Sequence, residues 1–93
     1  MTEKKLPISV VLLTRNEEAN ITACLESCEF AQEIVVIDDG SVDQTIRIAE
    51  EMGAKVFRRS MNGDWGAQQT YGISQTTNPW IFLLDADERV TPQ

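Results

Sequence analysis

The feature that most constrains the fold is an alternation of short apolar runs with segments of helical period. Apolar residues dominate positions 8–13, 33–37, 54–58 and 80–84. The first, second and fourth runs are nearly continuous in Val, Ile, Leu and Phe, which is typical of strands buried on both faces. The order β-α-β-α-β-α-β therefore predicts one three-layer α/β/α domain over residues 1–93, with a mostly parallel sheet of about four strands.

Three helices are predicted between these runs, from side chains spaced three and four residues apart. Their inward faces comprise Ile21, Cys24, Leu25 and Cys28, then Thr45, Ile48, Ala49 and Met52, and finally Ala67, Thr70, Tyr71 and Ser74.

Local signals mark the ends of these helices. We expect Asn16 to cap the first helix, and Ser41 with Gln44 to form a capping box at the second. Gly53 follows the second helix where a left-handed residue is favoured. The Asn-Gly-Asp sequence at 62–64 predicts a turn before the third helix.

Composition and charge exclude several classes of function. The 93 residues carry a formal net charge of −7 and no histidine. A chain this acidic is a poor partner for nucleic acid or for an anionic membrane surface. No run reaches the roughly 18 apolar residues of a membrane span, and no signal peptide is evident, so we expect a cytoplasmic chain without a transmembrane segment. Cys24 and Cys28 share a helical face and are interpreted as buried thiols.

Polar residues gather where three of the predicted strands end. They occupy 14–18 after the first strand, 38–41 after the second and 85–88 after the fourth. Ligands of open α/β sheets bind at the carboxyl ends of strands, so these segments predict a single site. Carboxylates dominate it, and Arg15 is its one strongly placed cation, able to order a nucleotide or to pair with Asp39.

Two acidic pairs indicate the chemistry. Asp38 and Asp39 end a buried strand, and a buried carboxylate needs donors such as those of a base and a ribose. Asp85 and Asp87 can both reach one site, and their oxygens suit Mn²⁺ or Mg²⁺, which can neutralise a diphosphate. Trp65 could be either a packing residue or a stacking platform, and the same holds for Tyr71.

Three segments, 7–18, 33–45 and 83–88, resemble family 2 glycosyltransferases, which have the GT-A fold. The resemblance spans almost the whole chain and is strongest to the bacterial lipopolysaccharide-core and beta-1,4-glucosyltransferase-like group. It implies the Rossmann-like half of a GT-A fold with strand order 3-2-1-4. Gln68 and Gln69 stand where such enzymes often carry a basic residue, which leaves a diphosphate contact open.

The resemblance also assigns roles to individual residues. The nucleotide pocket would include the ends of the first and second strands, with Asp39 as the base contact. The metal would be held by the acids after the fourth strand. In full, the resemblance implies nucleotide-sugar contacts from Thr14, Arg15, Glu17, Asp38, Asp39 and Asp85, and metal ligation by Asp87 with Asp85.

The implied activity is inverting transfer from a nucleoside-diphosphate sugar, most simply a UDP-sugar, to a glycan or lipid-linked acceptor in bacterial cell-surface glycan synthesis. Such enzymes continue past the Asp-x-Asp motif into an acceptor-binding half that holds the catalytic base. We therefore expect the base to lie outside this chain, which ends at Gln93. The 93 residues alone are expected to be inactive and to self-associate through the edge of the fourth strand.

Other functional classes fit less well. A nicotinamide-binding Rossmann domain or a P-loop would need glycines after the first strand, where Thr14, Arg15 and Asn16 stand. A non-catalytic module that binds a nucleotide or a metal remains the main alternative to an enzyme.

Overall fold

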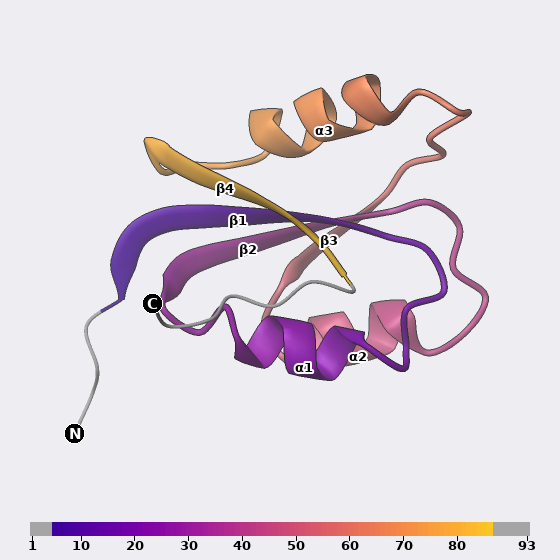
Figure 1. The fold of residues 1–93 in the computed structure, drawn as a ribbon, viewed down its shortest axis with the longest axis horizontal. Coiled ribbons are helices and arrows are strands. Elements are labelled where there is room, and N and C mark those ends of the chain that lie inside the picture. The colour runs from indigo at the N-terminus through magenta and orange to yellow at the C-terminus, as the bar shows by residue number, and fades with distance from the viewer. Residues whose placement is uncertain (1–4, 87–93) are drawn as a thin grey trace.

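The computed structural model describes residues 5–86, which form a parallel sheet between two helical layers (Figure 1). The strands are β1 (Leu6–Thr14), β2 (Ala31–Asp38), β3 (Lys55–Arg58) and β4 (Trp80–Asp85). They lie in the order β3-β2-β1-β4, and each neighbouring pair is parallel. The helices are α1 (Ile21–Glu26), α2 (Thr45–Glu51) and α3 (Trp65–Ser74). The predicted architecture and strand order are confirmed.

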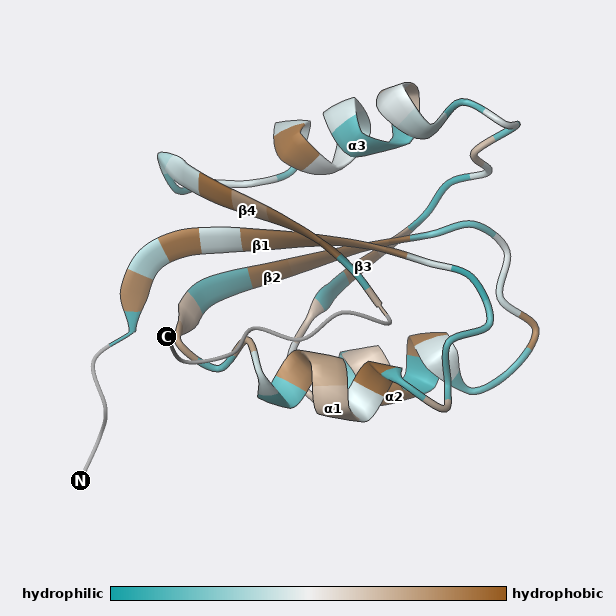
Figure 2. Ribbon diagram, in the orientation of Figure 1, coloured by the Kyte–Doolittle hydropathy of each residue, from teal (hydrophilic) through white to brown (hydrophobic). Residues whose placement is uncertain are grey.

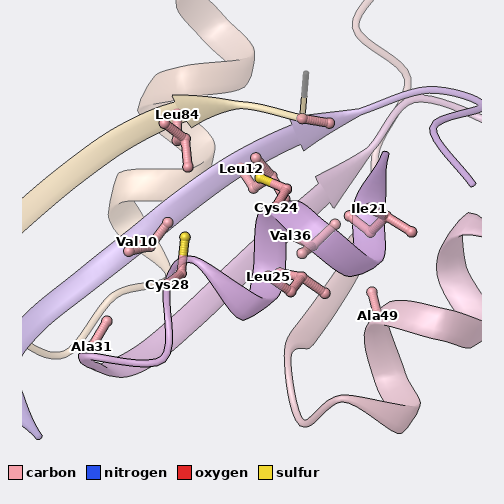
Figure 3. Close-up of a cluster of buried hydrophobic side chains, with 11 residues drawn as sticks. Val10, Leu12, Ile21, Cys24, Leu25, Cys28, Ala31, Val36, Ala49 and Leu84 are labelled. Atoms are coloured by element: carbon pink, nitrogen blue, oxygen red, sulfur yellow. The ribbon is translucent and has the colours of Figure 1, made fainter. Parts of the chain in front are cut away.

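One face of the sheet is covered by α1 and α2, and the main core lies there (Figure 3). Side chains of β1 and β2 such as Leu12 and Val36 are fully buried against this layer. Cys24 and Cys28 contribute to the same cluster and are fully buried free thiols, as predicted. Each large apolar side chain buried in this way stabilises the domain by about 1.5–3 kcal/mol.

Among residues 5–86, α3 alone covers the opposite face (Figure 1). Val11, Val35 and Ile37 pack there in a smaller cluster. Gly72 lets the helix backbone approach closely, since a Cβ at this position would lie 2.5 Å from Cγ1 of Val11 and 3.1 Å from Cγ1 of Ile37. Close packing at Gly72 fixes α3 over β1 and β2, with the start of the helix at the carboxyl ends of the strands.

The hydropathy of β4 contrasts with its exposure. The strand is apolar for most of its length (Figure 2). Trp80 is nevertheless 69% exposed, and Ile81, Phe82 and Leu83 are also exposed. Because β4 pairs only with β1 in this sheet, its far edge and much of its surface are not covered within residues 5–86.

A buried polar cluster joins β1, β2 and β3 to the segment that precedes β4. Glu33 of β2 accepts hydrogen bonds from the Ser9 hydroxyl (2.7 Å), from the Lys55 ammonium and from the Thr77 backbone N–H (2.8 Å). Asn78 in turn donates to the Ser9 hydroxyl. The cluster explains how a glutamate only 7% exposed is accommodated, and it fixes the segment that leads into β4.

The predicted cap of the first helix is wrong. The helix α1 begins at Ile21, with Asn20 as its N-cap residue. Asn16 lies further upstream in a left-handed conformation (φ 53°), and its side-chain oxygen accepts the Val42 N–H at 2.8 Å. The loop after β1 is therefore longer than the sequence signal indicated, and Asn16 connects it to the loop after β2.

The predicted capping box of the second helix is also wrong. The Thr45 N–H that opens α2 donates to Oδ1 of Asp43 (3.0 Å), while the Ser41 hydroxyl donates to Asp38. The signals at Gly53 (φ 93°) and at the 62–64 turn are confirmed, the latter by positive φ angles at Asn62 and Gly63. None of the helices in residues 5–86 is long and apolar enough to cross a lipid bilayer.

Candidate functional site

A pocket of about 320 Å³ opens at the carboxyl edge of the sheet. It receives residues from the ends of β1, β2 and β4, from the loop after β3 and from the first turns of α3. Predicted site residues among them are Thr14, Arg15, Glu17, Asp39 and Asp85. The structure thus brings five of the seven predicted residues to one cavity. Asp87 lies outside the described residues, and Asp38 lines a neighbouring groove.

Asp38 is held by the protein itself. Its side chain is fully buried and accepts three hydrogen bonds, from the Thr14 hydroxyl (2.6 Å), the Ser41 N–H (2.7 Å) and the Ser41 hydroxyl (2.6 Å). These donors offset the cost of burying the carboxylate. The contacts explain Asp38 structurally, and its predicted contact with a nucleotide stays a prediction.

Asp39 faces the pocket. Its N–H donates to the Thr14 carbonyl (2.9 Å), and its Oδ1 accepts the Met61 N–H (2.9 Å). Nη1 of Arg15 lies 3.8 Å from Oδ2, so the pairing considered for Arg15 is present. The Arg15 side chain is 68% exposed, and solvent screens such a pair strongly. A carboxylate has about four lone-pair positions, so Asp39 can accept a further hydrogen bond from a ligand.

The loops after β1 and β2 are interlocked. The Asn16 N–H donates to the Ser41 hydroxyl (2.7 Å), and the Val42 N–H donates back to the Asn16 side chain (2.8 Å). The Glu17 N–H donates to the Thr45 hydroxyl (2.8 Å). These bonds hold the rim of the pocket in one conformation, because the backbone on both sides of Arg15 and Glu17 is fixed.

Asp43 links the same two loops and accepts the N–H that opens α2. Its carboxylate accepts from the Thr45 hydroxyl and backbone N–H and from the Glu18 N–H. The Thr45 hydroxyl bond is the largest influence and lowers the pKa of Asp43; burial opposes it, and the backbone N–H groups add to the lowering. No sequence signal that we used identified Asp43, because the Ser41 spacing offered a competing cap.

A further wall of the pocket comes from the loop after β3 and from α3. Met61, which was not predicted, lines it together with Trp65 and Gln68, whose roles the sequence left open. Trp65 is 47% exposed, so its ring is available to a ligand. Gln68 is only 1% exposed, accepts from Nη1 of Arg59 (2.8 Å) and donates from Nε2 to the Arg59 carbonyl (2.6 Å).

Gln68 stands in the stretch where related enzymes often carry a basic residue, and in the fold Arg59 lies beside it. Arg59 also stacks on Tyr71, with Cζ 5.1 Å from the ring centroid. Tyr71 makes an edge contact with Phe57, which assigns it to packing. The sequence singled out Gln68 only through the resemblance, and nothing in it identified Arg59 as the partner.

One of the two acids expected to hold the metal lies at the pocket. Asp85 lines the pocket together with Glu17 and Asp39. Within the described part of the chain, no group of three or more Asp, Glu, Cys or His side chains is close enough to hold an ion by itself. Mg²⁺-type ions are commonly bound through one or two carboxylates plus substrate phosphates, and Asp85 fits that mode. Cys24 supports this position from the core, with its sulfur 3.8 Å from the Asp85 carbonyl.

The family model described as "Glycosyl transferase family 2" matches residues 9–93. The chain belongs to this family. A relative is the lipopolysaccharide core biosynthesis glycosyltransferase LpsC of Rhizobium meliloti, 38% identical over 90 residues that cover 92% of this chain and 33% of LpsC. The motifs at 14–18, 38–41 and 85–88 thus lie in a glycosyltransferase sequence, as the resemblance implied.

Solved structures of two proteins have a similar fold. Staphylococcus aureus TarS has a TM-score of 0.76 and 31% identity over 86% of this chain and 27% of TarS. Glucosyl-3-phosphoglycerate synthase of Mycobacterium tuberculosis, in complex with Mn²⁺, UDP-glucose and glycerol 3-phosphate, has a TM-score of 0.73 and 27% identity over 85% of this chain and 33% of the synthase. The chain spans about a third of the length of these relatives.

Proposed function

We propose that this chain is the donor-binding part of a glycosyltransferase and binds a nucleoside-diphosphate sugar, most simply a UDP-sugar, with Mn²⁺ or Mg²⁺. The observation that carries the proposal is the convergence of Thr14, Arg15, Glu17, Asp39 and Asp85 on one pocket at the carboxyl edge of a family 2 domain. Further support comes from the Mycobacterium tuberculosis synthase, whose complex contains Mn²⁺ and UDP-glucose.

The residues divide into two ends of one site. Asp39, Thr14 and Arg15 would orient the nucleoside, while Asp85 with Asp87 would hold the ion beside the diphosphate. A bound divalent ion neutralises the diphosphate and stabilises it as a leaving group. The interlocked loops after β1 and β2 keep the nucleoside-binding groups in place before the ligand arrives, which lowers the entropic cost of binding.

The whole protein would transfer the sugar, with inversion, to a hydroxyl of a glycan or lipid-linked acceptor in bacterial cell-surface glycan synthesis in the cytoplasm. The base that deprotonates the acceptor would lie beyond the 93 residues. This part of the proposal rests on the family and on the lipopolysaccharide-core relative.

A nucleotide panel tests donor binding. Melting temperatures are measured with UDP, CDP, GDP, ADP and UDP-glucose, each with Mn²⁺ and with chelator. A ligand at about 100 times its Kd stabilises by about 2.7 kcal/mol, which raises the Tm of a small domain by on the order of 10 °C. We expect that response for UDP and UDP-glucose with Mn²⁺. No response to any nucleotide would contradict the proposal.

A transfer assay separates the enzyme from a non-catalytic module. Release of UDP from UDP-glucose, with acceptor glycans present, is compared between the full-length protein and residues 1–93. Turnover only by the longer protein is expected. Nucleotide binding by both without any turnover would favour the non-catalytic alternative.

A further inference from the structure

The strand order places the candidate groups along one line. Arg59 follows β3, Asp39 follows β2, Thr14 ends β1 and Asp85 ends β4, and these strands are neighbours in that order. If the diphosphate lies at the Asp85 end, as proposed above, the base of the nucleotide lies at the β2–β3 end. The group that lies furthest along this line is Arg59.

Arg59 is held in place at four points. Its N–H donates to the Asp38 carbonyl (2.9 Å), and its carbonyl accepts from the Gln68 side chain (2.6 Å). Its guanidinium donates to the same Gln68 (2.8 Å) and stacks on Tyr71. Gln68 is nearly fully buried and lines the pocket, so the guanidinium lies one hydrogen bond from the pocket wall.

A groove next to the pocket also leads toward the residue that follows β3. A groove of about 700 Å³ is lined by Arg15, Asp39 and Met61, which it shares with the pocket, and by Arg59. The two spaces therefore adjoin at these shared residues. A base held by Asp39 can extend from the pocket toward the residue that follows β3.

Asp39 and Arg59 have opposite hydrogen-bonding character. An ionised carboxylate only accepts, and a guanidinium only donates, with five N–H groups of which the Gln68 contact uses one. Uracil offers a donor at N3 beside an acceptor at O4. Cytosine reverses both, with an acceptor at N3 and an amino donor at the 4-position. O4 also lies opposite the glycosidic nitrogen, so it is the uracil atom that points furthest from the ribose.

We propose that Arg59, positioned by Gln68 and Tyr71, determines nucleobase specificity by donating a hydrogen bond to O4 of uracil while Asp39 accepts the N3 hydrogen. The inference rests on the proposed function and specifies its donor as a uridine nucleotide. Cytidine nucleotides are rejected at both atoms, because the Asp39 carboxylate would face the N3 lone pair and Arg59 would face an amino group.

Titration calorimetry with Mn²⁺ tests the role of Arg59. UDP and CDP are titrated into the wild-type protein, Arg59→Met and the control Arg47→Met. Arg47 is exposed on α2, pairs with Glu51 and lines neither the pocket nor the groove. A hydrogen bond to a charged donor contributes a factor of roughly 10 to 100 in affinity. We expect Arg59→Met to weaken UDP binding by about tenfold or more and to narrow the preference for UDP over CDP. Arg47→Met should retain both the affinity and the preference.

A base analogue tests the specific atom without relying on one variant. In 4-thio-UDP, sulfur replaces O4 and is a weaker acceptor. The wild type should bind 4-thio-UDP more weakly than UDP, whereas Arg59→Met should bind the two equally. A general loss of structure cannot produce that pattern. Circular dichroism shows whether each variant folds. If Arg59→Met does not fold, the role of Arg59 is tested by the wild-type affinities for UDP and 4-thio-UDP and by the affinities of Arg59→Lys for the same two ligands.

Two results would overturn the inference, and they are distinguishable. If the wild type binds UDP but discriminates against neither CDP nor 4-thio-UDP, Arg59 does not read the base and the proposed function stands. If the wild type binds no nucleoside diphosphate with Mn²⁺, both the inference and the proposed function are wrong.

Discussion

Oγ1 of Thr14 donates a 2.6 Å hydrogen bond to Oδ1 of Asp38, and this contact joins the last residues of β1 and β2 at the edge of the pocket. The same carboxylate accepts two hydrogen bonds from Ser41. Asp38 therefore links two strands and a loop, which makes it a stabilising residue of the site whether or not it contacts a ligand.

Asp38→Ala is expected to lower the free energy of unfolding by about 3 kcal/mol, because three donors, one of them buried, lose their acceptor. Urea denaturation followed by circular dichroism measures the change. Thr14→Ser, which keeps the hydroxyl, should lose much less. If Asp38→Ala were as stable as the wild type but bound UDP poorly, Asp38 would be a ligand contact rather than a structural group.

Asp39→Asn should reduce discrimination between UDP and CDP, because an amide can also donate a hydrogen bond and is no longer a pure acceptor. The affinity for UDP is expected to fall by roughly tenfold, measured by titration calorimetry with Mn²⁺. The Met61 N–H can still donate to the amide oxygen, so the fold should be retained. Unchanged affinity and selectivity would move the base contact to another residue.

Asp87→Ala should weaken UDP binding only when Mn²⁺ or Mg²⁺ is present, because its role is expected to pass through the ion. Calorimetric titrations with metal and with chelator give the two affinities. A loss of about tenfold with metal and none in chelator is the expected result. Equal losses under both conditions would show that Asp87 does not act through a metal.

Glu33 should make stability depend on pH in the acid range. Burial acts to raise its pKa, but hydrogen bonds from Lys55, Ser9 and Thr77 and the charge of Lys55 outweigh burial and lower it from 4.5 to about 2. A depressed pKa stabilises the fold above pH 4.5, and this stabilisation is lost as the pH falls toward 2. It amounts to on the order of 2–3 kcal/mol.

Glu33→Gln should therefore be less stable at pH 7 and should show a shallower loss of stability between pH 5 and pH 2. Denaturant titrations at intervals across this range provide the test. Lys55→Met removes one group that lowers the pKa and should give an intermediate slope. An unchanged slope in Glu33→Gln would assign the acid sensitivity to other carboxylates.

Residues 1–93 are expected to self-associate through β4. Leu6, Trp80, Ile81 and Phe82 contribute to an apolar groove at that edge, and unpaired strand edges favour pairing with another chain. Light scattering coupled to size exclusion at micromolar concentration should give a mass above that of a monomer. Ile81→Lys should shift the protein toward the monomer.

A control at another exposed apolar residue makes the edge test specific. Val42 is 90% exposed in the loop after β2, away from β4. Val42→Lys adds the same charge and should leave the mass unchanged. If the wild type has the mass of a monomer and Ile81→Lys has the same mass, association through this edge is ruled out.

Patterns along the chain were enough to predict the sheet and most of the residues at its carboxyl edge. Continuous apolar runs have no polar face to turn toward water, so the runs in β1 and β2 had to be buried between two layers. Parallel strands connected by helices end at the same edge, so the proximity of Arg15, Asp39 and Asp85 could be predicted without knowing their contacts. Five of the predicted site residues could be found in this way.

The partners of those residues were decided only by tertiary structure. Asn16 and Ser41 both carry local helix-capping signals, yet they bind each other's loops, because long-range contacts satisfied their polar groups better than the nearest helix. Likewise, Asp38 and Asp39 are adjacent in sequence but differ in environment, since Asp38 ends β2 and is buried among its own donors while Asp39 follows the strand and lines the pocket.

Arg59 illustrates the same limit. Nothing in its local sequence distinguishes it from Arg58, and the helical residue that holds it is nine positions away. Gly72 sets how closely α3 approaches the sheet, and that distance decides whether Gln68 can reach Arg59. Periodicity predicted Ala67, Thr70, Tyr71 and Ser74 as the inward face of α3, but the buried residues of this helix are Gln68 and Gly72. The groups that meet across a helix face depend on packing distances that only the folded chain defines.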